Sequence, residues 1–219
     1  EGSATLSVLH NNGNGTFAPK FDYSTGMTTH PYSVAAADFD GDGKPDLVVA
    51  NQIGGAVGVF RNRGNGTFSG LTGYLVGLNP YAVAAADLDS DGRPDIVTVN
   101  YFSSTMSVLR NNGDGTFAVA AGYITGSSPR AVAVGDLDGD GKPDLAVANE
   151  LTADVSVFHN SGNGTFGAKV DYPTDNGANG VAITDLDGDG KLDLAVTTGT
   201  ENTVDVLLNN GNGTFGAKV

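Results

Sequence analysis

An acidic nine-residue segment recurs four times in this chain at a constant interval of 49 residues. The first copy reads DFDGDGKPD and spans 38–46, and the others span 87–95, 136–144 and 185–193. Each copy has an aspartate at its first, third, fifth and ninth positions. Internal repetition at a fixed period of this length is typical of solenoids, propellers and other repeat arrays. The period therefore constrains the fold more strongly than any local pattern does.

A second marker, Asn-Gly-Thr-Phe, follows the same period. It occupies 14–17, 65–68, 163–166 and 212–215, and an Asp variant occupies 114–117. Five such markers accompany four acidic segments, so we expect a leading half repeat and four complete repeats. We expect one repeat domain, divided into a half repeat at 1–26 and repeats at 27–76, 77–125, 126–174 and 175–219.

Each repeat contains signals for four short strands. In the first repeat we expect strands at 33–37, 47–50 and 56–60, and a fourth from Phe68 to about Val76. The third of these alternates, with Val57 and Val59 on one face and Gly58 on the other, as a strand does. The Asn-Gly pairs accept positive φ and favour tight hairpins. In the half repeat we expect strands only near 6–9 and 17–23.

Four short strands per repeat, with no segment of helical period, are typical of a propeller blade. The sequence thus predicts an all-β fold, a β-propeller built from four-stranded blades. The alanine-rich first strand should be the inner one, because blades crowd toward the axis and leave little room for large side chains. The half repeat would supply only the last two strands of a blade.

The acidic segments have the composition of cation-binding loops. Alternate aspartates separated by glycine let a short loop curl so that its oxygens converge, which suits a hard divalent ion such as Ca²⁺. An EF-hand is excluded, because its loop needs a glutamate at the twelfth position. That position is here occupied by Val49, Thr98, Val147 and Val196.

The net charge supports the same interpretation. The formal charge is −14, and the four segments contain 16 of the 25 acidic residues. Four bound Ca²⁺ ions would bring the charge to −6. The chain has no basic patch, which argues against nucleic acid, and no apolar run long enough to span a membrane. Its start shows no signal peptide, and it has no cysteine. A chain that uses Ca²⁺ in place of disulfides suits the outside of a bacterium, so we expect an extracellular or cell-surface protein.

These motifs together resemble the FG-GAP/VCBS repeat, which is found in integrin α-subunit propellers and in secreted bacterial proteins. The resemblance rests on Asp-x-Asp-x-Asp-Gly-x-x-Asp after a Val/Ala-rich strand, followed by Asn-Gly-x-Gly-Thr-Phe, and it covers nearly the whole chain. It implies a calcium-binding β-propeller. Family propellers usually have seven or eight blades, whereas this chain carries four and a half repeats.

The resemblance also implies four Ca²⁺ sites with defined ligands. Each site would use the four aspartates of one acidic segment and the backbone carbonyl of its seventh residue. The implied ligands are Asp38, Asp40, Asp42, Asp46 and Lys44; Asp87, Asp89, Asp91, Asp95 and Arg93; Asp136, Asp138, Asp140, Asp144 and Lys142; and Asp185, Asp187, Asp189, Asp193 and Lys191. Two departures remove no ligand: Ser90 replaces a loop glycine and should tighten the second loop, and Leu192 replaces the loop proline and should loosen the fourth.

A second candidate site lies just before the alanine-rich strands, where the repeats differ from one another. Its residues would form a ligand face, with the alternative that the tyrosine rings only cover the blade ends. The candidates are His30, Tyr32, Asn79, Tyr81 and Arg130. Elsewhere we expect His10 and His159 on the surface, and the repeated Phe17, Phe68, Phe117, Phe166 and Phe215 in the core.

No grouping of catalytic residues can be assembled from the sequence, so we expect a protein that is not an enzyme. The function we expect is a calcium-stabilised extracellular module for binding or cell adhesion, with a protein or glycan ligand, which also self-associates into an oligomer or filament. The alternative is the non-catalytic propeller portion of a larger secreted enzyme that acts on polysaccharide.

Overall fold

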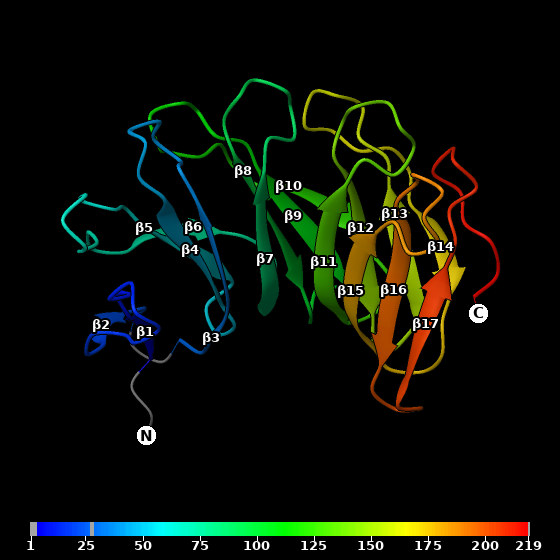
Figure 1. Cartoon of the computed structure of the whole chain (residues 1–219), viewed down its shortest axis with the longest axis horizontal. Helices are drawn as coiled ribbons and strands as arrows, with labels where there is room; N and C mark the ends of the chain where they lie inside the picture. The colour runs from blue at the N-terminus through cyan, green and yellow to red at the C-terminus, as the bar shows by residue number, and fades with distance from the viewer. Residues whose placement is uncertain (1–3, 27–28, 219) are drawn as a thin grey trace.

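The computed structural model describes residues 4–26 and 29–218, and this part of the chain forms 17 strands in five antiparallel sheets (Figure 1). The expected repeat limits at residues 1, 27 and 219 lie outside the described residues. The described part contains no helix, so it contains no helix that is long and apolar enough to cross a membrane.

Three of the sheets have four strands each, in chain order. The first contains β3 (Pro31–Ala37), β4 (Asp46–Asn51), β5 (Ala56–Phe60) and β6 (Thr72–Leu75). The second contains β7 (Pro80–Ala86), β8 (Asp95–Asn100), β9 (Thr105–Leu109) and β10 (Ala121–Ile124). The third contains β11 (Pro129–Gly135), β12 (Asp144–Asn149), β13 (Asp154–Phe158) and β14 (Val170–Pro173). We number these sheets as blades 1 to 3.

The two remaining sheets are smaller. Blade 4 contains β15 (Ala178–Thr184), β16 (Asp193–Thr198) and β17 (Thr203–Leu207), and the half repeat contains β1 (Thr5–Val8) and β2 (Phe21–Ser24). The expected four-strand unit is therefore present in blades 1 to 3, and so is the two-stranded half repeat, whereas blade 4 has three strands among the described residues. The sheets do not close into a ring within the described residues.

The expected fourth strand is shorter than its apolar pattern predicted. It begins at Thr72, not at Phe68, and ends at Leu75. Phe68 instead forms an isolated bridge with Asn62, which closes the hairpin that contains the Asn-Gly turn. The residues between Phe68 and Thr72 connect this hairpin to β6. The predicted strand therefore combined two separate features, the bridge at Phe68 and the short strand β6.

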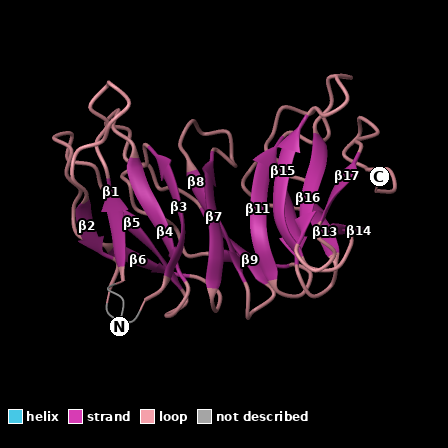
Figure 2. Ribbon diagram, turned by 60° about the horizontal axis from the view of Figure 1, so that its bottom comes forward, coloured by secondary structure: helices cyan, strands magenta, loops and turns pink. Residues whose placement is uncertain are grey.

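The first strands of successive blades lie side by side. β7 contacts both β3 and β11, and β11 contacts β15, so the alanine-rich strands are the inner ones, as expected (Figure 2). Each of the four inner strands begins with a proline or an alanine and ends at an acidic loop. The acidic loops therefore gather at one end of the inner strands, and the segments before these strands gather at the other end.

The hydrophobic core is divided into layers between neighbouring blades. Val48, Ala50 and Val57 of blade 1 pack with Ile96 and Leu109 of blade 2 in one such layer. Equivalent layers join blade 2 to blade 3 and blade 3 to blade 4. In blades 1 to 3 the second strand is covered on both faces, and its sequence is a nearly continuous apolar run. Contacts between neighbouring blades thus make up the hydrophobic core clusters.

The phenylalanine of the Asn-Gly-Thr-Phe marker packs across this blade boundary. The rings of Phe117 and Phe39, whose centroids are 5.3 Å apart, belong to blade 2 and to the acidic loop of blade 1. Phe166 and Phe215 are buried in the same way, with at most 9% of their surface exposed. The prediction of a core residue is wrong for Phe17, which is 60% exposed, because no acidic loop of a preceding blade covers it in the described residues.

Each inner strand contains a bulge at its second residue. The pairing register shifts between Pro31 and Ser33, and it shifts at the equivalent place in β7, β11 and β15. The skipped residues are Tyr32, Tyr81, Arg130 and Asn179. A bulge leaves its extra residue out of the ladder and changes the direction of its side chain. The inner strands thus present these four residues at the end of the molecule opposite the acidic loops.

Candidate metal centres and an aromatic face

The first aspartate of each acidic loop holds the loop closed. Asp38 Oδ1 accepts the backbone N–H of Gly41 at 2.9 Å, and its Oδ2 accepts that of Gly43 at 2.8 Å. Gly41 and Gly43 have φ of 74° and 82°, a conformation that glycine adopts without steric cost. The curled backbone directs the following carboxylates inward. Asp136 and Asp185 accept the corresponding bonds in the third and fourth loops.

The last aspartate of each loop is buried at the start of the second strand. Asp95 is 1% exposed and accepts the backbone N–H groups of Leu88 at 3.0 Å and Asn111 at 2.8 Å. Burial raises the pKa of Asp95 to about 6 and also raises the pKa values of Asp46 and Asp144. A cation beside these groups would favour their ionised forms.

The loops bring carboxylate oxygens close together. In every loop three aspartates each offer one oxygen within 4.8 Å of the other two. The groups are Asp38, Asp40 and Asp42; Asp87, Asp89 and Asp95; Asp136, Asp138 and Asp140; and Asp185, Asp187 and Asp193. Of the remaining predicted carboxylates, Asp144 belongs to a second group with Asp138 and His159, whereas Asp46, Asp91 and Asp189 are in none.

The seventh residue of each loop, whose backbone carbonyl is a predicted ligand, is basic. Its side chain forms an ion pair with the third aspartate of the same loop. Lys44 Nζ lies 2.7 Å from Asp42 Oδ2, and Arg93 Nη1 lies 3.0 Å from Asp91 Oδ2. Lys142 and Lys191 make the same pair with Asp140 and Asp189, each at 2.5 Å. The hydrogen bond from Lys44 lowers the pKa of Asp42. An incoming cation therefore meets this carboxylate in its ionised form.

The donor set fits a hard divalent cation. Each group consists of carboxylate oxygens on a glycine-containing loop, the donor type that Ca²⁺ takes in proteins. Asp89 Oδ1 is buried and has no hydrogen-bond partner within the described residues, and burial together with the Asp91 charge raises the pKa of Asp89. An orphaned carboxylate oxygen of this kind is satisfied when an ion binds. Ser90 keeps the loop curled by adopting a φ of 61°.

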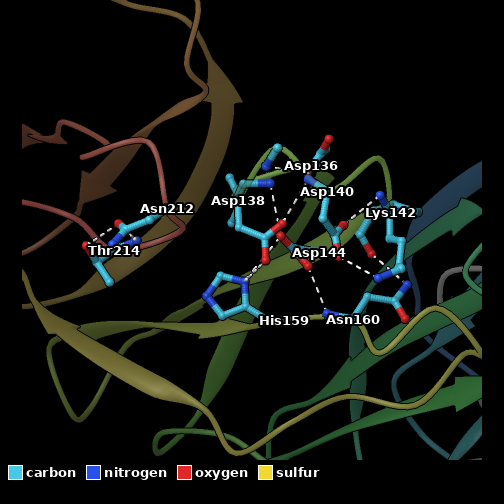
Figure 3. Close-up of polar contacts among 12 residues, drawn as sticks. Asp136, Asp138, Asp140, Lys142, Asp144, His159, Asn160, Asn212 and Thr214 are labelled. Atoms are coloured by element: carbon cyan, nitrogen blue, oxygen red, sulfur yellow. Dashed lines mark hydrogen bonds and ion pairs between the residues drawn. The ribbon is translucent and has the colours of Figure 1, made fainter.

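Residues from the end of the third strand also reach the acidic loops, which the sequence did not indicate. Arg61 Nη1 donates to Asp40 Oδ2 at 2.8 Å, and its Nη2 donates to the carbonyl of Asp114 in the next blade at 3.0 Å. His159 occupies the same repeat position in blade 3 and faces Asp138 and Asp144 (Figure 3). His159 lies between two blades with 32% of its side chain exposed. The only signal in the sequence was the basic residue at this repeat position in blades 1 to 3, namely Arg61, Arg110 and His159.

At the opposite end, three of the predicted ligand-face residues meet. The rings of Tyr32 and Tyr81 have centroids 4.2 Å apart, and Arg130 Cζ lies 5.3 Å from the centroid of Tyr81. Arg130 Nε donates to Glu150 Oε2 at 2.7 Å, and the Tyr101 hydroxyl donates to the same oxygen at 2.8 Å. Burial, with a hydrogen bond that the Tyr81 hydroxyl donates to Tyr32, raises the pKa of Tyr81 to about 12. Tyr101 and Glu150 complete this aromatic face and were missed, because they follow the second strands.

The two other predicted ligand-face residues have different positions. Asn79 is 8% exposed and adopts a φ of 62°, and its carbonyl accepts the N–H of Tyr101 at 2.8 Å. It is a buried turn residue, so its inclusion among the exposed ligand residues is wrong. His30 is exposed, and its carbonyl accepts the N–H of Gln52 at 2.9 Å.

Repeated four-stranded sheets, inner strands packed side by side and an acidic loop after each inner strand define a propeller-like repeat protein. The model of the FG-GAP-like repeat matches residues 2–49, 38–98, 87–147, 136–196 and 185–219. The chain therefore belongs to the FG-GAP-like repeat family, as the sequence motifs indicated. No curated protein matches this chain.

Solved structures agree with this fold. An Agrocybe aegerita lectin, studied for specific recognition of non-reducing terminal N-acetylglucosamine, is 28% identical, with a TM-score of 0.65 over 99% of this chain and 60% of its own. The periplasmic gluconolactonase PpgL of Pseudomonas aeruginosa is 16% identical, with a TM-score of 0.74 over 98% of this chain and 62% of its own. The V. cholerae biofilm matrix protein Bap1 is 17% identical, with a TM-score of 0.58 over 99% of this chain and 39% of its own. The chain thus spans 60% of the length of the lectin that it resembles.

Proposed function

We propose that this protein is a calcium-stabilised extracellular binding scaffold without chemistry of its own. The observation that carries the proposal is the convergence of three carboxylates in each of four loops at the same repeat position. Like charges held this close repel one another, and a divalent cation removes the repulsion. Each loop links an inner strand to the second strand of its blade, so a bound ion would stabilise the blade at its most crowded end.

Calcium is the ion that suits these loops best. The donors are carboxylate oxygens on curled loops rich in glycine, and Ca²⁺ accepts six to eight oxygens in flexible geometry. The ligands we propose are the four aspartates of each loop together with the carbonyls of Lys44, Arg93, Lys142 and Lys191. A Ca²⁺-dependent fold without cysteine also suits a bacterial cell surface, where calcium is plentiful.

Thermal melts test this proposal directly. An ion that binds only the folded state at a hundredfold excess over Kd stabilises it by about 2.7 kcal/mol per site. Melting temperatures in Ca²⁺ and in EDTA should therefore differ by many degrees, and titration calorimetry should give four ions per chain. Equal melting temperatures in both solutions would overturn the role of calcium.

The aromatic face is the ligand surface that we propose for the scaffold. It lies at the bulges of the inner strands, and bulges often direct side chains at binding sites. Tyr32 is 52% exposed and stacks on Tyr81, and the Arg130–Glu150 pair beside Tyr81 offers donors and an acceptor. Aromatic rings with a charged pair at their edge suit the apolar face and the hydroxyl groups of a sugar ring.

A glycan is therefore the ligand class that we favour, with a protein ligand as the other outcome. The Agrocybe aegerita lectin, which recognises a terminal sugar, supports this choice. Glycan-array binding should be lost on Tyr32→Ala and on Arg130→Asn, since asparagine stands at the equivalent position 179. Val119→Ala, at a position 97% exposed, is the control and should bind normally. An array without any signal would favour a protein ligand.

The alternative, a non-catalytic propeller portion of a secreted enzyme that acts on polysaccharide, would use the same aromatic face. It predicts binding of polymer chains and not of single terminal sugars. Comparing long and short oligosaccharides on the same array separates the two functions.

A further inference from the structure

The third acidic loop has a nitrogen donor beside its carboxylates. His159 Nδ1 lies 3.3 Å from Asp144 Oδ2 and 3.7 Å from Asp138 Oδ2 (Figure 3). The three donor atoms lie within 4.8 Å of one another. His159 directly follows β13, Asp138 lies in the loop between β11 and β12, and Asp144 begins β12. The cluster thus joins the first three strands of blade 3.

The same repeat position carries other residues in the other blades. Arginine stands there in blades 1 and 2, as Arg61 and Arg110, and leucine stands there in blade 4, as Leu208. Arg61 places a guanidinium on Asp40, and a guanidinium has no lone pair for a metal. His10 of the half repeat bonds the carbonyl of Gly66 at 2.8 Å and has no acidic loop before it within the described residues. Among the described residues, only His159 joins an imidazole to an acidic loop.

The spacing of the three donors suits a small divalent ion. Donors about 2.0 to 2.2 Å from a tetrahedral zinc ion stand roughly 3.3 to 3.6 Å apart. The distances from Nδ1 to the two carboxylates, 3.3 and 3.7 Å, are close to this range. Imidazole favours zinc and other first-row transition ions over calcium, which takes oxygen ligands. Three protein donors would leave a fourth position for water.

The donors are also held in place from outside the cluster. Asp144 is 1% exposed, and it accepts the N–H of Asn160 at 2.8 Å and that of Leu137 at 3.0 Å. The His159 ring packs against Gly213 of the blade 4 hairpin, where a Cβ would collide with it. Contacts of this kind fix the orientation of metal ligands before the metal binds.

We propose that His159, Asp138 and Asp144 form a transition-metal site, with zinc as its probe, in the third loop alone. The inference rests on the proposed role of the acidic loops as cation sites. Because Asp138 and Asp144 are shared, zinc and calcium exclude each other at this loop. The other three loops remain sites for calcium. The third loop would thus bind a different ion from the other three acidic loops.

Calorimetry on the full chain, stripped of metal by EDTA and dialysed, tests the site. We expect one Zn²⁺ per chain, and we expect His159→Arg to lower the affinity for zinc by at least tenfold. Zinc should also reduce the number of Ca²⁺ ions bound from four to three. The variant carries the residue found at positions 61 and 110, so the hairpin of blade 4 should accept it. His10→Arg is the matched control and should leave zinc binding unchanged.

Two further measurements decide between the outcomes. Co²⁺ in place of zinc should give the visible absorption of a tetrahedral site in the wild type and not in His159→Arg. If that variant fails to fold, the imidazole NMR signals of the wild type supply the answer, and only His159 should shift with zinc. Equal zinc binding by His159→Arg, or a zinc shift confined to His10 or His30, overturns the inference. Calcium binding at four loops without any zinc binding overturns it too, and leaves the calcium proposal intact.

Discussion

The side-chain amide of Asn111 donates a hydrogen bond of 2.9 Å to the backbone carbonyl of Phe39, 72 positions earlier in the chain. The donor begins the hairpin of blade 2, and the acceptor lies in the acidic loop of blade 1. Asn160 makes the same bond to Leu88, and Asn209 makes it to Leu137. Each of the first three acidic loops is therefore joined to the following blade by one buried amide, which links its candidate metal centre to the blade boundary.

Replacing Asn111 by alanine should destabilise the protein by about 1 to 3 kcal/mol, since it leaves a buried carbonyl without a donor. Asn62→Ala is the matched control. Asn62 makes the equivalent bonds within its own blade, to Pro45 and Gly64, but has no bond of this kind to a preceding blade in the part of the chain that the structure describes. Urea unfolding of both variants measures the difference. Equal loss of stability in the two variants would show that the bond between blades contributes nothing.

Much of this arrangement follows from the sequence alone. The position of the acidic loops, the identity of the inner strand and three of the four strands in the first repeat follow from the period and from local alternation. These features depend on residues close together in the chain. The sequence predicted that the four aspartates of each loop converge, and it could not indicate that the groups of three differ, with Asp42 in the first loop and Asp95 in the second.

Contacts between blades could not be predicted in the same way. Arg61 bonds Asp114, 53 positions away, and no local pattern specifies how two blades pack. The exposure of Phe17 and the burial of Asn79 likewise depend on which segment covers them. The bulge at Tyr32 escaped notice because a one-residue shift of register leaves the composition of the strand unchanged.

Replacing one loop aspartate should remove one ion. Asp42 belongs to the group of three carboxylates in the first loop, so Asp42→Ala should lower the Ca²⁺ count from four to three while the other affinities change little. Asp114→Asn is the control, because it removes a charge from a hairpin whose other copies carry asparagine. Titration calorimetry measures both. An unchanged count of four in Asp42→Ala would exclude the first loop as a site.

Magnesium should not replace calcium in these loops. Mg²⁺ demands near-ideal octahedral geometry and dehydrates reluctantly, whereas the loops offer several oxygens from a curled backbone. Adding Mg²⁺ to the EDTA-treated protein should leave its melting temperature close to that of the metal-free form. Equal recovery with Mg²⁺ and Ca²⁺ at the same concentration would contradict the expected selectivity.

Asp154 should make stability depend on pH. Burial raises the pKa of Asp154, against the hydrogen bonds that it accepts from Asn149 and Thr152. Because the folded-state pKa of Asp154 exceeds its unfolded value, its contribution to the free energy of unfolding is fully present below the unfolded pKa. That contribution is lost as the pH rises through the folded pKa. Asp154→Thr should thus raise the melting temperature at pH 7 and give less or no gain at pH 3.5.

Threonine is a suitable replacement at position 154, because Thr105 and Thr203 occupy the same repeat position. Thr105 accepts a hydrogen bond from Asn100 at 3.1 Å, as Asp154 does from Asn149 at 2.6 Å. The variant therefore keeps an acceptor while it removes the charge. Calorimetric melts at the two pH values measure the effect, and an equal gain at both would assign it to packing instead of titration.

Blade 4 exposes apolar residues whose counterparts in the other blades are buried. Leu186 is 44% exposed, whereas Phe39, Leu88 and Leu137 at the same loop position are at most 2% exposed. Val204 is 57% exposed, whereas its counterpart Val155 is fully buried. In blades 1 to 3 these positions are covered by the following blade. Blade 4 thus presents the same kind of apolar layer to solvent.

This surface should make the 219-residue chain self-associate in the presence of Ca²⁺. Exposed apolar area of the kind that joins blades favours contact with a second copy, and a head-to-tail contact that does not close would extend into a filament. Light scattering should show a mass that rises with concentration. Leu208→Arg, which carries the residue of positions 61 and 110, combined with Leu186→Gln should return the chain to a monomer. A wild type that stays monomeric at high concentration would contradict the prediction, and an association unchanged by the two substitutions would place the contact elsewhere.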